Sequence, residues 1–304
     1  MPRPTTAREI WQTYEGPTFI LAAAVYGLWA LLIAAHNVLP WFVWAPPLIY
    51  IVALQFSLQH ETIHAMRQVP PWLRRAIAMP PLGLWLPYPL YNRGHSRHHR
   101  NIHITDPYED PESFYHTQLT WDRIGPVWRM IHTVNQTLLG RVVIGPFVRL
   151  YRLTQRETTL LIQGDFGNFR IWCWHLLMLA ALYLYVDRVC GLAWWRYVVF
   201  IAYPAFGLGL IRSFYEHRWA PLPGQRVASV ESNWFFGLLF LFNNLHVAHH
   251  LKPTIPWYRL PGFYRANREK LLIHNANYVF TGYTTIARQW LVRPVFRPVH
   301  PNRT

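Results

Sequence analysis

The chain has few cysteines, few acidic residues and only two lysines among its 304 residues. Cys173 and Cys190 fall in or near one apolar stretch and are too far apart along a helix to pair. They exclude a disulfide framework and fit a reducing compartment. The 14 acidic residues against 29 basic ones leave a formal charge of +15, which suits anionic lipid head groups or an acidic protein partner.

Features that divide a chain into domains are also missing. No low-complexity tract or flexible linker interrupts the sequence, so we expect a single domain over residues 1–304. Residues 1–16 are polar, and no small-residue cleavage site follows the first apolar run. We therefore expect no cleavable signal peptide.

Long apolar stretches and aromatic residues are abundant. Aromatic residues make up 16% of the chain, including 16 tryptophans, as is typical of membrane interfaces. Four stretches approach the ~20 residues that cross a hydrocarbon core ~30 Å thick. They cover residues 17–36, 40–58, 171–187 and 194–215. A globular protein rarely carries four such runs, so the sequence predicts an all-α, multi-pass membrane protein with about four transmembrane helices in two hairpins.

Basic residues predict the orientation. Thirteen arginines lie between the second and third stretches, and seven arginines and both lysines follow residue 250. Such segments face the cytoplasm. We therefore expect both termini and a helical cap, formed by residues 60–170 and 217–304, on the cytoplasmic side. This organisation makes nucleic-acid binding improbable despite the charge.

Eight histidines form three tight clusters. They are His60 and His64 in HETIH, His95, His98 and His99 in HSRHH, and His246, His249 and His250 in HVAHH. Residues three or four apart project from one face of a helix, so each cluster can direct its imidazoles at one point, and three converging helices can enclose two metals. Imidazole suits zinc, copper, iron or nickel, so the ligand type alone does not select the metal.

These clusters resemble the histidine boxes of the integral-membrane fatty acid desaturases and of the related hydroxylases and carotenoid ketolases. The resemblance runs from the second apolar stretch to the third box, and NNLHVAHH is especially similar. It implies two iron ions held by the eight clustered histidines, O₂ as co-substrate, and a ninth ligand near the end of the fourth stretch, for which His217 is the candidate.

Several neighbouring residues are candidates for supporting the ligands. Asn243 and Asn244 precede the third box, and Glu216 can orient a ligand or simply pair with an arginine. Ser213 stands where some desaturases carry an asparagine that holds a metal-bound water, a departure from the family's pattern. His103 extends the face of the second box. Asp106, Asp110 and Glu112 follow that box, with turn formation as the default interpretation.

Breaking an unactivated methylene C–H bond needs an oxidant that no side chain supplies, and two irons with O₂ supply one. The favoured function is therefore an O₂-dependent fatty acid or acyl-lipid desaturase. A hydroxylase or ketolase acting on a lipid, alkane or carotenoid would use the same residues. A non-catalytic metal-binding or transport protein is disfavoured, because transport sites normally lie at the membrane midplane. No fused haem module is evident, so we expect a separate ferredoxin, rubredoxin or cytochrome with its reductase to supply electrons.

Overall fold

The structure is a computed structural model that describes residues 6, 11 and 13–303. The predicted cytoplasmic N-terminal end therefore lies largely outside the described residues. The described chain is mostly helical, with 63% helix and 3% strand. This content confirms the predicted all-α class.

In the described part of the chain, four helices are long and apolar enough to cross a membrane, which agrees with the predicted number. They are α2 (Gly16–Ala34), α3 (Trp41–His64), α10 (Phe169–Tyr183) continued by η1 (Leu184–Val189), and α11 (Trp194–Tyr197) continued by η2 (Val198–Ala202) and α12 (Tyr203–Ser213). Many of their leucines and aromatic residues are exposed, as expected for side chains that face lipid.

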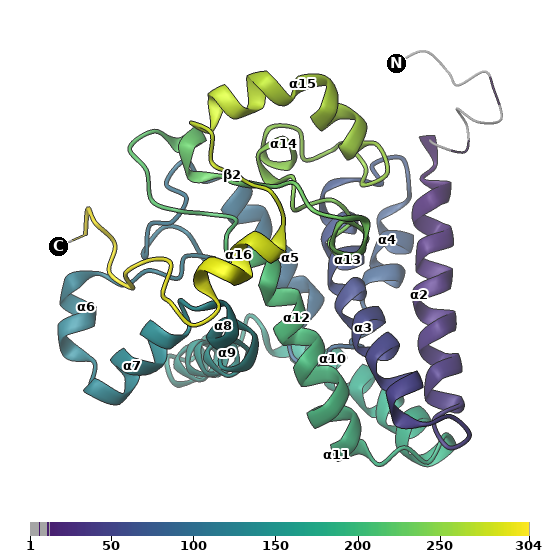
Figure 1. The fold of residues 1–304 in the computed structure, drawn as a ribbon. Helices are drawn as coiled ribbons and strands as arrows, with labels where there is room; N and C mark the ends of the chain where they lie inside the picture. Colours follow the sequence, from purple (N-terminus) through teal and green to yellow (C-terminus); the bar gives the residue numbers. More distant parts are fainter. Residues whose placement is uncertain (1–5, 7–10, 12, 304) are drawn as a thin grey trace.

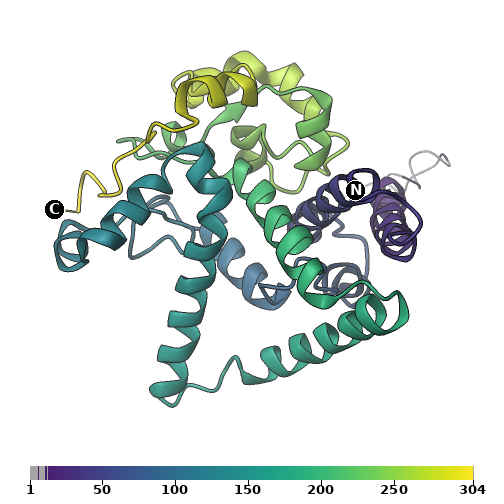
Figure 2. The same cartoon turned by 60° about the horizontal axis from the view of Figure 1, so that its bottom comes forward.

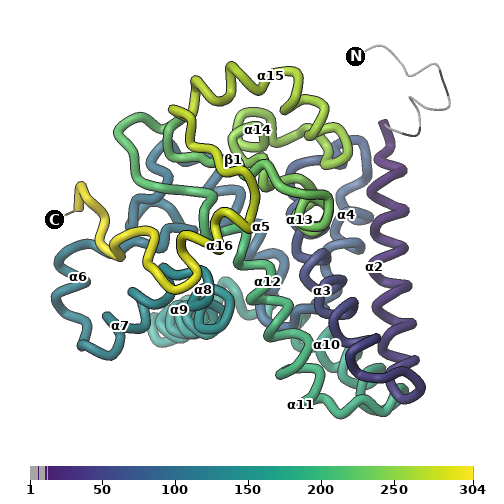
Figure 3. The backbone as a smooth tube through the Cα atoms, viewed as in Figure 1, coloured from purple at the N-terminus to yellow at the C-terminus, as the bar shows by residue number. Residues whose placement is uncertain are grey.

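The largest boundary difference is in the second span. It was predicted to end near residue 58, but α3 continues to His64 without a break. Hydropathy falls at the polar segment Gln59–Glu61, whereas the helical hydrogen bonds do not depend on hydropathy. Helix α3, labelled in Figure 3, is a candidate membrane span, and the first histidine box forms its last turn.

The spans pack through a shared apolar core. Helix α2 lies along α3, and α12 crosses α3 on another side (Figure 1). Trp29 of α2 donates a hydrogen bond to the Tyr197 hydroxyl at 3.0 Å, and Tyr197 in turn donates to the Leu82 carbonyl at 2.7 Å. Satisfied polar groups of this kind fix the relative positions of helices in an apolar environment.

Shorter elements fill the rest of the described chain. They are α4 (Pro71–Ala78), α5 (Tyr88–His99), α6 (Gln118–Arg123), α7 (Pro126–Val134), α8 (Leu138–Val143), α9 (Gly145–Ile162), η3 (Pro223–Arg226), α13 (Trp234–Leu239), α14 (His246–Leu251), α15 (Leu260–His274) and α16 (Tyr283–Trp290). Strands β1 (Ser229–Val230) and β2 (Val279–Phe280) pair in parallel. Figure 2 shows α9 and α10 as two arms that meet at a turn away from the other helices.

Candidate metal centre

One histidine cluster lies at the end of a candidate membrane helix, and the other two lie on short helices. His60 and His64 occupy the last turn of α3, and the second box occupies the end of α5. The third box forms most of α14. His217 was expected at the end of the fourth span, but α12 ends at Ser213, and His217 lies beyond it in an isolated bridge with Val227.

The structure brings all nine histidines together in two groups, each able to hold a metal ion. Within a group, one ring nitrogen from each histidine lies within 4.8 Å of those of the others. The first group contains His60, His64, His95, His99 and His249, and the second contains His98, His217, His246 and His250. The groups are adjacent, because the His99 and His250 rings stack with their centroids 4.2 Å apart.

Boxes two and three are each divided between the two groups, rather than directed at one point. In a helix, successive residues turn by about 100°, so residues i and i+4 differ by about 40°, whereas i+3 and i+4 differ by about 100°. His95 and His99 therefore share the first group, and His98 joins the second. In the third box, His246 and His250 share the second group, and His249 joins the first.

The donor atoms fit metal ions. Nε2 of His98 lies 3.0 Å from Nε2 of His217, and Nε2 of His99 lies 3.2 Å from that of His249. Two nitrogens bound at ~2.1 Å to one ion would lie about 3.0 to 3.4 Å apart. Both ring nitrogens of His60 and the Nε2 atoms of His64 and His95 are buried without a hydrogen-bond partner. Such unsatisfied groups are costly unless something binds them.

The electrostatic environment keeps most of these imidazoles neutral. Burial and then neighbouring histidines lower the pKa of His99, His246, His249 and His250. Burial is also the main reason that the pKa of His217 falls to about 3. A neutral imidazole has a lone pair free for a metal, so these side chains are prepared for ligation at neutral pH.

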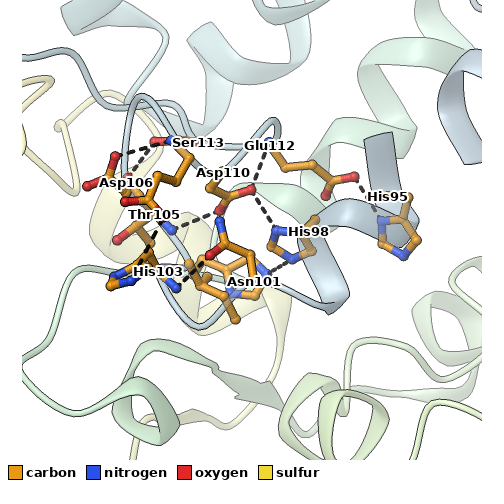
Figure 4. A network of polar contacts seen from close by, with 12 residues as sticks. His95, His98, Asn101, His103, Thr105, Asp106, Asp110, Glu112 and Ser113 are labelled. Carbon is orange, nitrogen blue, oxygen red and sulfur yellow. Dashed lines mark hydrogen bonds and ion pairs between the residues drawn. The ribbon is translucent and has the colours of Figure 1, made fainter. Parts of the chain in front are cut away.

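Two carboxylates orient histidines of the second box (Figure 4). His95 Nδ1 donates to Glu112 at 2.8 Å, and His98 Nδ1 donates to Asp110 at 2.8 Å. Both bonds leave Nε2 directed away from the carboxylate, as in metal sites where a carboxylate fixes the histidine tautomer. Burial alone would lower the pKa of His98, but nearby Glu112 and the hydrogen bond to Asp110 raise it.

The third box has a comparable support. Glu216 lies 3.4 Å from His246 Nδ1 and pairs with Arg212 at 2.9 Å. Burial raises the pKa of Glu216 to about 7, although the Arg212 charge opposes this shift. The Asn243 carbonyl also lies 3.2 Å from His246 Nδ1. Glu216 thus pairs with an arginine and also lies beside a histidine of the third box.

The remaining candidates lie elsewhere. The Asn244 side chain donates to the Val230 carbonyl, and Ser213 donates to the Leu210 carbonyl. His103 is exposed and belongs to neither histidine group, while Asp106 forms a turn and accepts from Arg303 at 2.7 Å.

Sequence reasoning treated Asp110 and Glu112 as turn formers by default. Asp110 follows its partner His98 by 12 residues, and Glu112 follows its partner His95 by 17 residues. A loop sets these separations and they follow no helical period, so the sequence did not reveal the contacts.

A cavity of about 330 Å³ adjoins the first group. Its wall is mostly apolar and comes from α3, α5, α9, α12 and the segment before α5, with His95, Glu112 and Glu216 at one part of it. Phe56, one helical turn before His60, and Phe206 stand close together in this wall with ring centroids 5.9 Å apart. The volume is at the lower end of the range for small-molecule sites.

Candidate spans together with two histidine groups define a membrane protein whose sites can bind metal. The sequence profile of the family described as fatty acid desaturase matches residues 39–282 of the 304. The chain belongs to the fatty acid desaturase family, as its histidine boxes predicted. No curated protein matches the chain.

Proposed function

We propose that this protein is a di-iron, O₂-dependent oxidoreductase that introduces a double bond into a fatty acyl chain. The observation that carries the proposal is the adjacency of two histidine groups to an apolar cavity, in a chain of the desaturase family. The first group would hold one iron and the second group the other. Two irons with O₂ supply an oxidant strong enough to remove hydrogen from a methylene group.

The protein's own residues have separate tasks in this proposal. The imidazoles provide neutral nitrogen ligands, and Glu112 and Asp110 hold His95 and His98 in the required orientation. The apolar wall around Phe56 and Phe206 excludes water and places the chain against His95. Whether the product is an alkene or an alcohol depends on small differences in that placement.

Electron supply and orientation complete the proposal. A separate ferredoxin, rubredoxin or cytochrome with its reductase would deliver electrons, and the positive charge of the chain suits an acidic carrier. The histidine groups would face the cytoplasm, where such carriers are found.

The test compares wild type with His249→Ala in cells that also express a ferredoxin and its reductase. His249 is a buried member of the first group, so its removal leaves that group with four histidines. Lipid mass spectrometry should reveal products lighter by two hydrogens in wild type and absent in His249→Ala. Purified wild type should contain about two irons per chain, and His249→Ala fewer.

His103→Ala is the matched control, because His103 lies near the second box but in neither group. It should retain both the product and the iron. A product heavier by one oxygen would mean that the same site catalyses hydroxylation and not desaturation. Wild-type protein without bound iron would contradict the enzyme proposal and favour a different metal or a non-catalytic role.

A further inference from the structure

The cavity beside the histidines carries an excess of positive charge. Four arginines and two glutamates contribute to its lining. They are Arg149, Arg152, Arg156 and Arg212 with Glu112 and Glu216. A site for a neutral chain does not need this surplus, which includes half-buried Arg149 and exposed Arg156.

Both glutamates are already engaged. Glu112 accepts from His95, and Glu216 pairs with Arg212. In the described part of the chain neither glutamate forms an ion pair with an arginine of α9, although the charge of Arg149 lowers the pKa of both.

One arginine of α9 also has partners inside the protein. The Arg152 guanidinium donates to His116 Nε2 at 3.0 Å and to the Ser113 carbonyl at 3.4 Å. By contrast, Arg149 and Arg156 form no ion pair with any residue in the described part of the chain. Within the described residues, they are the cavity arginines whose guanidinium groups have neither a hydrogen-bond partner nor an ion-pair partner.

Their positions place both cations along one wall. Arg149 and Arg156 are seven residues apart, which is about two helical turns or ~10 Å along α9. Both belong to the cavity lining, whereas Phe147 and Tyr151 of the same helix are exposed and absent from it. The arginines therefore line the cavity together with Leu150 and Leu153 of the same helix, while Phe147 and Tyr151 lie outside the lining.

We propose that Arg149 and Arg156 bind the anionic head group, a carboxylate or a phosphate monoester, of the amphiphile whose chain occupies the cavity. The inference rests on the proposed function in taking an aliphatic chain as the occupant. Guanidinium groups form charge-assisted, often bidentate hydrogen bonds with both kinds of anion. The substrate is thus an anionic single-chain lipid held at its head by α9.

The experiment measures binding to purified, iron-loaded protein in detergent, with three amphiphiles of equal chain length. Hexadecanoate and hexadecyl phosphate test the two head groups, and hexadecanol is the neutral reference. The Arg149→Gln/Arg156→Gln protein should bind the preferred anion at least about tenfold more weakly, while hexadecanol binding changes by less than about twofold. Arg170→Gln, on an exposed arginine outside the cavity, should behave as wild type.

Each outcome decides the inference. A preference for hexadecanoate or for hexadecyl phosphate identifies the head group, and Arg149→Lys/Arg156→Lys should retain part of it. Equal binding of all three amphiphiles by wild type would overturn the proposal, as would equal losses of anionic and neutral ligands in the double variant. Binding needs no turnover, so failure here is distinguishable from absence of oxidation by the wild type.

Discussion

At the scale of single residues, the orientation of a histidine ring depends on the hydrogen-bond partner of its second nitrogen. Glu112 and Asp110 occupy Nδ1 of His95 and His98, so Nε2 is the nitrogen left to bind. A histidine without such a partner can rotate or change tautomer. The loop after α5 is therefore part of the metal site, although its residues need not touch the metal.

Glu112→Gln should weaken metal binding while leaving the fold intact. An amide is a weaker acceptor for the His95 N–H than a carboxylate, and loss of such a partner typically costs 10- to 100-fold in metal affinity. Competition with a chelator, followed by measurement of iron per chain, checks this. Glu109→Gln is the control, because Glu109 is half exposed in the same loop and contacts no histidine of either group. Equal retention of iron by both variants would contradict the role assigned to Glu112.

At the scale of elements, α12 must approach α8 closely to bring Arg212 and Glu216 to the histidines. A Cβ atom on Gly207 would lie 2.3 Å from the Val142 carbonyl oxygen of α8. Backbone atoms cannot give way as a side-chain end can, so only glycine permits this approach. Small residues serve the same purpose in many membrane helix contacts.

Gly207→Ala should destabilise the protein by about 1–3 kcal/mol, the usual cost of overpacking. Gly27→Ala on α2 is the matched control, since nothing lies within 4 Å of its added Cβ. Alanine is favoured over glycine in helices by roughly 0.5–1 kcal/mol, so this variant should be unchanged or more stable. Thermal unfolding in one detergent compares the two. A Gly207→Ala protein as stable as Gly27→Ala would show that α8 can move without penalty.

At the scale of the whole molecule, the distribution of arginine predicts which side of the membrane the histidines face. The link between α2 and α3 has no basic residue other than His36, whereas the segment around the second box is rich in arginine. The second segment should therefore lie in the cytoplasm.

Labelling of single cysteines tests this orientation. In a protein with Cys173→Ser and Cys190→Ser, cysteine would be placed at Val38 or Ile102, whose exposed fractions are 81% and 69%. An impermeant maleimide should label position 102 only in inverted vesicles and position 38 only in right-side-out vesicles. Labelling of both positions from one side would contradict the two-hairpin topology, and the reverse pattern would contradict the orientation alone.

Much of the fold could be read from local sequence. The spans follow from apolar runs whose length matches a bilayer, and the structure agrees to within a few residues except at the end of α3. The breaks at the prolines before and after residues 71–78 were also predictable, because proline cannot continue a helix interior. Histidine spacing was sufficient to identify the family and the type of ligand.

The sequence by itself determined the four candidate spans, the family and which residues form the histidine boxes, because these depend on composition and on spacing along a single helix. Only the tertiary structure divided nine histidines into groups of five and four, placed Asp110 and Glu112 behind the second box, and enclosed a cavity beside unpaired arginines. These features arise from contacts between segments far apart in the chain. Their positions are set by how helices and loops pack, and no local periodicity encodes that packing.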